Sequence, residues 1–158
     1  MTEVATEDRA EHRLIAKGEV VRHTVRYTRD EIAAFARMTH DRNPLHHDTR
    51  AAQLARFGEV IASGQQTGAI MMGVLATHFS RSDPGGLRRE MLCLDLSLGF
   101  KHPVFAGQDV DIEWLVTEVE WNAKLGGCIG QLEGSARSPG GQVAVQARST
   151  VLVRHALA

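Results

Sequence analysis

Residues 65–79 form a charge-free stretch with the sequence Gln-Gln-Thr-Gly-Ala-Ile-Met-Met-Gly-Val-Leu-Ala-Thr-His-Phe. The stretch predicts a helix that is apolar almost all round, and such a helix is expected to be buried. Gly68 and Gly73 each cost about 1 kcal/mol relative to Ala inside a helix. We therefore expect another part of the chain to approach the helix closely at these glycines.

The residues before this helix predict one strand, one helix and a loop. Apolar and polar residues alternate over 19–27, which indicates a half-buried strand. A capping-box pattern then begins a helix over 29–38. Asn43-Pro44 must interrupt helical structure, because the residue before a proline avoids the helical region and proline has no N–H to donate. Residues 41–46 therefore form a loop.

The residues after the charge-free helix follow a period of two. One strand face is predicted to carry Leu92, Leu94, Leu96, Leu98 and Phe100, and further strands are expected over 110–121, 126–137 and 142–154. The connections are too short for helical crossovers, so the sheet is expected to be antiparallel. The fold class is therefore α+β, with the sheet wrapped around the long central helix.

Composition and charge exclude several classes of function. The chain has 158 residues with 18 Lys and Arg against 19 Asp and Glu, a near balance that argues against a nucleic-acid partner. Cys93 and Cys128 form no CxxC pair, so we expect two buried thiols instead of a disulfide framework or a zinc site. No window has the apolar length of a membrane span, and residues 1–13 lack the apolar core of a secretory signal. We expect a cytoplasmic protein with a peripheral polar lead over 1–17 and one domain over 18–158.

The loop Asp41-Arg42-Asn43-Pro44-Leu45-His46 is the sharpest candidate for chemistry. A carboxylate and an imidazole on a proline-restricted loop can converge on one small volume at a low entropy cost. The first is a base at neutral pH, and the second gives or takes a proton there. In the structural alternative, Asp41 ends a helix, Asn43 satisfies a turn and His46 is solvated.

Ser63-Gly64, at the start of the charge-free helix, is a second candidate. Backbone N–H groups at a helix N-terminus can stabilise an oxyanion, and a glycine lets a carbonyl group approach closely. Alternatively, Ser63 only caps the helix. The histidines at 40, 46 and 47 lack a second cluster of ligands, so no metal site is expected.

Three segments resemble the MaoC-like (R)-specific enoyl-CoA hydratases. Residues 41–46 match the signature D-x-N-P-x-H, and residues 57–64 (Phe-Gly-Glu-Val-Ile-Ala-Ser-Gly) are similar to the segment that leads into the family's central helix. Residues 98–109 (Leu-Gly-Phe-Lys-His-Pro-Val-Phe-Ala-Gly-Gln-Asp) resemble the family's F-K-x-P-V-x-x-G-D strand and turn. The similarity runs from about Gly18 to the C-terminus.

The resemblance implies a single hot-dog domain, a homodimer whose two sheets join, and an acyl-CoA or acyl-carrier thioester substrate near the dimer interface, with no cofactor. The implied reaction is reversible addition of water to a trans-2-enoyl thioester. Asp41 and His46 would hold and activate the water, and Asn43 would orient the loop. The N–H of Gly64 would polarise the thioester carbonyl. An acyl-CoA thioesterase or a non-catalytic acyl-binding subunit on the same scaffold is the alternative.

The chain departs from the family pattern at several positions. His40 stands where the family usually has Gly or an acidic residue, and Ser63 replaces the usual His before Gly64. Gln65 and Gln66 place polar side chains where apolar ones commonly line the acyl pocket. These departures predict a polar, branched or short acyl group.

Overall fold

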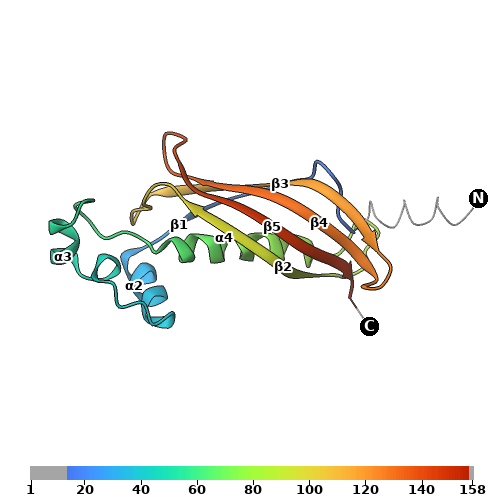
Figure 1. Cartoon of the computed structure of the whole chain (residues 1–158), viewed down its shortest axis with the longest axis horizontal. Helices are drawn as coiled ribbons and strands as arrows, with labels where there is room; N and C mark the ends of the chain where they lie inside the picture. The colour runs from blue at the N-terminus through green and yellow to red at the C-terminus, as the bar shows by residue number, and fades with distance from the viewer. Residues whose placement is uncertain (1–13, 157–158) are drawn as a thin grey trace, which may run out of the picture.

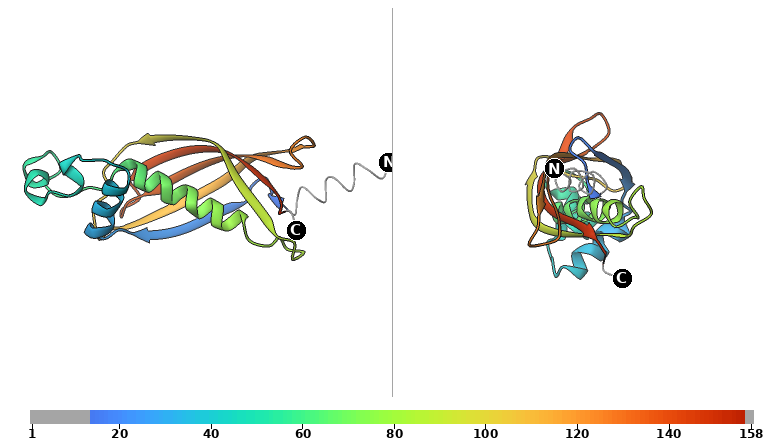
Figure 2. Two further views of the ribbon diagram at one scale, coloured as in Figure 1. Left: turned by 90° about the horizontal axis from the view of Figure 1, so that it is seen from below. Right: turned by 90° about the vertical axis from the view of Figure 1, so that its right-hand side faces the viewer.

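The computed structural model describes residues 14–156. Five strands form one antiparallel sheet in the order β1-β3-β4-β5-β2. The strands are β1 (Val20–Arg26), β2 (Arg89–Phe100), β3 (Asp109–Asn122), β4 (Gly127–Arg137) and β5 (Val143–His155). The sheet curls around α4 (Gly64–Phe79), while α2 (Arg29–Met38) and α3 (Thr49–Leu54) lie at one end (Figure 1, Figure 2). The predicted α+β arrangement of a sheet around a central helix is confirmed.

The side of α4 that faces the sheet forms the centre of the core. Met71, Leu75 and Phe79 are fully buried, and the indole N–H of Trp114 on β3 donates a hydrogen bond to the carbonyl oxygen of Met71 at 3.0 Å. The expected close approach is found at Gly68, where the side chain of Leu98 on β2 occupies the space of a Cβ. Gly73 has no atom within 4 Å of that position, so no contact within the described chain explains this glycine.

One stripe of α4 is open to solvent, and the prediction of burial all round is wrong there. The stripe consists of every fourth residue, namely Gln65, Ala69, Gly73 and Thr77. Residues four apart lie on one face of a helix. The curled sheet covers the opposite face and leaves this one uncovered (Figure 2).

A β-bulge changes the faces of β2. The register with β5 shifts between Cys93 and Asp95, and an extra residue in a strand reverses the alternation of the side chains that follow it. Leu96 and Leu98 pack against the core as predicted, whereas Leu92 and Leu94 are about half exposed, at 48% and 50%. Phe100, at the end of the strand, is also exposed, at 54%. The expectation of two buried thiols holds for Cys128 and is wrong for Cys93.

Both ends of α2 are capped by local hydrogen bonds. The hydroxyl of Thr28 accepts from the N–H of Glu31 at 3.1 Å, and the carboxylate of Glu31 accepts from the N–H of Thr28 at 2.7 Å, which confirms the capping box. At the C-terminal end, His40 adopts a positive φ of 58°, and the N–H of Asp41 donates to the carbonyl oxygen of Ala36 at 2.8 Å. This Schellman motif fixes the direction in which the chain leaves the helix.

Two residues of the lead expected over 1–17 lie in the core. Residues 1–13 lie outside the described range, but Leu14 and Ile15 are 1% and 2% exposed and belong to the core. Their apolar side chains are removed from water in the same cluster as α4 and the sheet. Within residues 14–156, no helix has the length and apolar character needed to cross a membrane.

Candidate active site

Local turn chemistry shapes the loop that follows α2. The N–H of Asn43 donates to Oδ1 of Asp41 at 2.9 Å, and Oδ1 of Asn43 accepts from the N–H of Leu45 at 3.2 Å. Pro44 then begins the short 3-10 helix η1 (Pro44–His46), where its missing N–H costs nothing. Asn43 therefore satisfies the turn, as the structural alternative expected, and the same turn places Asp41 and His46 near each other.

The imidazole of His46 is buried and fixed by the backbone, so the structural alternative of a solvated His46 is wrong. Its Nδ1 lies 2.7 Å from the carbonyl oxygen of Ile61, and the N–H of Ile61 donates to the carbonyl of Leu45 at 3.1 Å. A carbonyl oxygen only accepts, so Nδ1 carries the proton and Nε2 is the acceptor of the neutral ring. Nε2 lies 3.4 Å from Oδ2 of Asp41.

Asp41 and His46 thus present two proton acceptors to one small volume. An ionised carboxylate has no hydrogen to donate, and neither has Nε2 of the neutral imidazole. One water molecule can donate one hydrogen to each of them. The side chain of Asp41 is 27% exposed and that of His46 only 8%. Solvent would therefore reach such a water from the side of Asp41. The arrangement suits general base and general acid chemistry on water.

The N-terminus of α4 lies beside this pair. Ser63 is buried, and its hydroxyl accepts from the N–H of Gln66 at 3.3 Å, so Ser63 is the helix cap, as the alternative for this residue expected. Gly64 is the first residue of the helix, where N–H groups have no acceptor in a preceding turn. A Cβ at Gly64 would lie 2.5 Å from the ring of Phe100, so the close approach of this ring requires a glycine.

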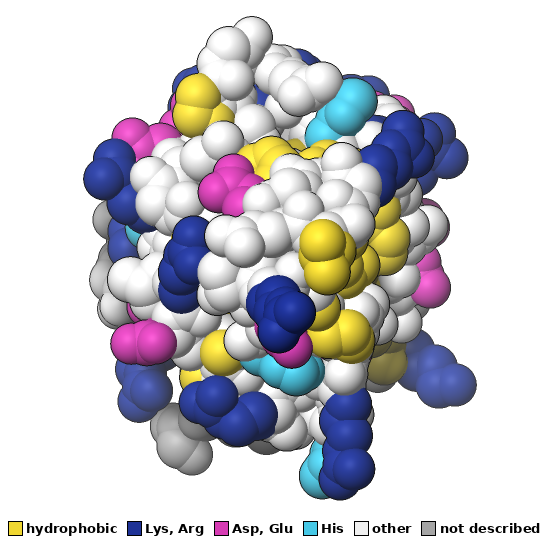
Figure 3. Space-filling view, turned by 90° about the vertical axis from the view of Figure 1, so that its left-hand side faces the viewer, with side chains coloured by type: hydrophobic (Ala, Val, Ile, Leu, Met, Phe, Trp, Pro, Cys, Tyr) yellow, Lys and Arg dark blue, Asp and Glu magenta, His cyan; other side chains and the backbone are white. Residues whose placement is uncertain are grey.

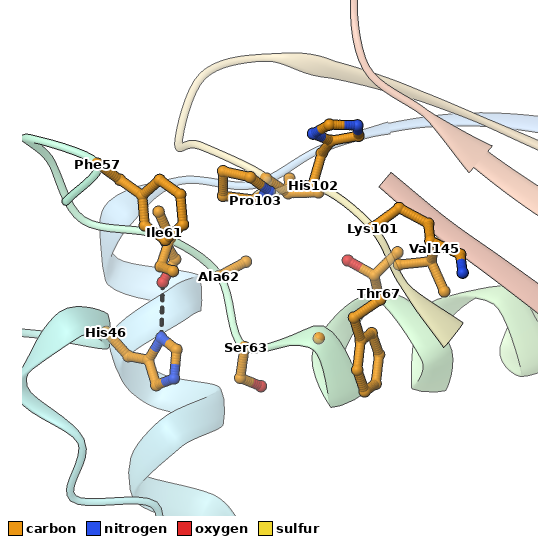
Figure 4. A pocket seen from close by; sticks show the side chains of 13 residues that line it. His46, Phe57, Ile61, Ala62, Ser63, Thr67, Lys101, His102, Pro103 and Val145 are labelled. Atoms are coloured by element: carbon orange, nitrogen blue, oxygen red, sulfur yellow. Dashed lines mark hydrogen bonds between the residues drawn. The ribbon is translucent and has the colours of Figure 1, made fainter. Parts of the chain in front are cut away.

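A cavity of about 310 Å³ connects the helix start with the loop. His46, Ser63 and Gly64 line it from the predicted site, together with Phe57, Ile61, Ala62, Thr67, Phe100, Lys101, His102, Pro103, Val104 and Val145 (Figure 4). Asp41 borders a different hollow, of about 590 Å³, between α2 and the loop. Asn43 lines neither of these two spaces. The structure therefore brings Asp41 to His46, although each of these two spaces is lined by only one member of the pair.

Three residues of the site were missing from the sequence prediction. The carbonyl of Ile61 orients His46, the ring of Phe100 covers Gly64, and the hydroxyl of Thr67 lies 3.0 Å from the buried hydroxyl of Tyr27. Thr67 lies almost one helical turn after Gly64, so helical spacing could have identified it. The other two contacts join segments that are distant in sequence, and no local pattern signals them.

Charge around the site is mixed. At the end of the molecule that carries α2 and α3, Lys and Arg side chains are spread among acidic and apolar ones (Figure 3). In the part of the chain that the structure describes, no three or more His, Cys, Asp or Glu side chains come together as a metal site would require. Any negatively charged ligand must therefore be bound by a few local cations and not by a broad positive field.

A curled antiparallel sheet around one helix, with an Asp–His loop beside the start of that helix, defines a hot-dog protein with a site suited to acid–base chemistry. The family model described as MaoC like domain matches residues 13–126. The chain belongs to this family.

Individual relatives agree in fold. The chain is 35% identical over 100 residues to the (R)-specific enoyl-CoA hydratase of Aeromonas caviae, covering 63% of this chain and 69% of that protein. A solved (R)-hydratase structure from A. caviae superposes with a TM-score of 0.74 at 30% identity, over 87% of this chain and 96% of that one. A mitochondrial 3-hydroxyacyl-[acyl-carrier-protein] dehydratase of Solanum lycopersicum is 28% identical over 104 residues, or 66% of this chain. The match spans only 58% of the tomato protein's length.

Proposed function

We propose that this protein adds water to, or removes it from, the 2,3 double bond of an enoyl thioester. The observation that carries the proposal is the distance of 3.4 Å between Oδ2 of Asp41 and Nε2 of His46, two acceptors held beside the N-terminus of α4. The names of the relatives support the same class of reaction. The name of the Aeromonas hydratase further supports a product of R configuration.

In the hydration direction, one water molecule donates its two hydrogens to Asp41 and His46. As one of these groups takes a proton, the water oxygen forms a bond to the β-carbon, and the electron pair of the double bond moves toward the thioester. The N–H of Gly64 donates to the carbonyl oxygen, where negative charge develops. The protonated group, Asp41 or His46, then returns this proton to the α-carbon, which gives the 3-hydroxyacyl thioester and restores the pair. Asn43 and Ser63 act as positioning residues, since their side chains hold the loop and the helix start.

A panel of trans-2-enoyl thioesters, presented on CoA and on an acyl carrier protein, tests the proposal. Loss of enoyl absorbance measures hydration, and chiral chromatography of the product gives the configuration. We expect the R product and a rate reduced by about 10²-fold or more in His46→Gln, as is typical when a general acid or base is lost. Release of free thiol without loss of the double bond would instead identify a thioesterase. Binding without turnover of any substrate would contradict an enzymatic role.

We infer a homodimer joined through β2. Among residues 14–156 this strand pairs only with β5, so its other edge is open in the described sheet. Leu92, Leu94 and Phe100 on this strand are about half exposed. An open edge with apolar side chains is a template for pairing with a second chain. Sedimentation should show a dimer that Leu94→Lys weakens and Leu87→Lys does not, because Leu87 is equally exposed but precedes the strand. A monomeric wild-type protein would contradict this assembly.

The location that we propose is the cytoplasm. The near-balanced charge and the lack of a membrane-crossing helix among residues 14–156 are compatible with it. Cell fractionation with an antibody against the protein would test the location, and recovery in an organelle or in the medium would contradict it.

A further inference from the structure

A third hollow, of about 330 Å³, lies between α2 and α4. It is lined mainly by apolar side chains from α2, β1 and α4, among them Val25, Phe35, Met38 and Ile70. Its volume is at the lower end of the range for small-molecule sites. Mixed into this apolar lining are a few polar groups, and they determine which ligand the hollow can hold.

The side-chain oxygen of Gln66 lies in this lining without a hydrogen-bond partner among the described residues. The residue is 5% exposed, and no described residue donates a hydrogen bond to its buried Oε1. A buried amide oxygen without a partner costs free energy in the folded protein. Most buried polar groups have a partner, so an orphan that lines a hollow points to a donor from a bound molecule.

The other polar side chains around the hollow are already engaged. Arg26 donates to Asp109 at 2.8 Å, Glu31 accepts from the N–H of Thr28 at 2.7 Å, and the hydroxyl of Tyr27 is bonded to that of Thr67. Neither charge is therefore free to bind an ionic ligand. The group that Gln66 would receive is uncharged, and a hydroxyl fits either orientation of the amide because it both donates and accepts.

The lining of the hollow lies close to the catalytic pair along the chain: Met38 is three residues before Asp41, and Gln66 is two residues after Gly64. With Nδ1 of His46 held by Ile61, Nε2 points the other way, toward Ser63 (Figure 4). It faces Asp41, which lies three residues after the last residue of α2. Gln66 lies three residues after Ser63 and is bonded to it through its backbone N–H. A chain that starts at the reacting carbon beside Nε2 would therefore enter the space between α2 and α4 and meet Gln66.

We propose that this hollow binds the distal part of the acyl chain and that Gln66 selects enoyl thioesters with a hydroxyl group on that part. The proposal rests on the proposed hydratase function. Gln66 is then a specificity-determining residue that contacts substrate away from the reacting atoms. A plain alkyl chain would fill the apolar lining and leave the amide unpaired, whereas a hydroxylated chain would satisfy both.

The test compares trans-2-enoyl-CoAs with and without a terminal hydroxyl over a range of chain lengths. We expect wild-type kcat/KM to favour the hydroxylated compound at the matching length by about tenfold, the size expected when a buried amide gains a partner. Gln66→Leu should remove or reverse this preference. Gln65→Leu is the matched control, because Gln65 is the exposed neighbour, and it should keep the wild-type ratio.

Two readouts separate this proposal from the hydratase function. Crotonyl-CoA carries no hydroxyl on its acyl chain, so its turnover by the wild type reports the reaction alone. If no thioester is turned over, thermal shifts with hydroxylated and plain acyl-CoAs still measure the selectivity of the hollow. Gln66→Met serves as a second variant if Gln66→Leu does not fold. The proposal would be overturned if the wild type showed no preference between hydroxylated and plain compounds. It would also be overturned if the preference persisted in both Gln66 variants.

Discussion

Oδ2 of Asp41 lies 3.4 Å from Nε2 of His46, while Nδ1 of the same imidazole is held by the carbonyl oxygen of Ile61 at 2.7 Å. The backbone of one segment thus sets which nitrogen of His46 faces the carboxylate. Both groups accept a hydrogen from the same water in the proposed reaction. Their contributions to the hydration rate should therefore depend on each other.

The first prediction concerns this dependence. Asp41→Asn and His46→Gln should each lower kcat/KM for enoyl-CoA hydration by roughly 10²- to 10⁴-fold. The double variant should be about as slow as the slower single variant, because residues that act as a unit are not additive. His47→Gln is the matched control, since His47 is exposed and its Nε2 lies 3.4 Å from the backbone carbonyl oxygen of Arg42. Losses that multiply in the double variant would indicate two independent roles.

The second prediction concerns the glycines of α4. Gly64→Ala should lower both stability and hydration rate, because its Cβ would lie 2.5 Å from the ring of Phe100, although the N–H is retained. Adding Phe100→Leu should restore part of the rate by relieving the overlap. Gly73→Ala has open space around it and should instead stabilise the helix by about 0.5–1 kcal/mol. Urea unfolding and hydration assays on the same preparations check all three results.

The third prediction concerns the turn after α2. His40 holds a φ of 58°, a region that costs a residue with a Cβ roughly 1–2 kcal/mol. Because Gly loses more backbone entropy on folding, His40→Gly should stabilise the protein by a smaller amount, about 0.5–1 kcal/mol. His40→Ala should give no such gain, since Ala retains the Cβ. Equal free energies of unfolding for the two variants in urea would show that the positive φ is not the cause.

The fourth prediction concerns alkaline pH. Burial raises the pKa of the Tyr27 hydroxyl, and its hydrogen bond with Thr67 lowers it by less. The pKa of this hydroxyl is about 10 in the unfolded chain and higher in the folded protein, so the folded state binds the proton more tightly. Stability is therefore unaffected by this group below about pH 10 and decreases as pH rises through the folded pKa. Tyr27→Phe should remove this part of the decrease.

Absorbance offers a direct check, because Tyr27 is the single tyrosine of the chain. The tyrosinate signal of the native protein should appear at higher pH than that of the protein in urea. Identical titrations in the two states would contradict a buried, hydrogen-bonded phenol.

Local sequence signals predicted the elements and the turn of the site well. The start of α2 follows from the capping box at Thr28, and the loop geometry follows from Asn43 and Pro44. Each of these depends on hydrogen bonds between residues a few positions apart. The positive φ of His40 at the end of α2 was not predicted. The bulge in β2 gave no such signal, because Leu94 fits a regular alternation and only pairing with β5 shows the shift.

The sequence by itself determined the α+β class, the central helix and the pairing of a carboxylate with an imidazole on one loop. These features arise from the period of the apolar residues and from backbone chemistry within a few residues. Only the tertiary structure decided that Ile61 orients His46, that Phe100 requires Gly64, that one stripe of α4 is open and that Gln66 is buried without a partner. Each of these depends on how distant segments fill the space around the helix, and packing in three dimensions leaves no local pattern in the chain.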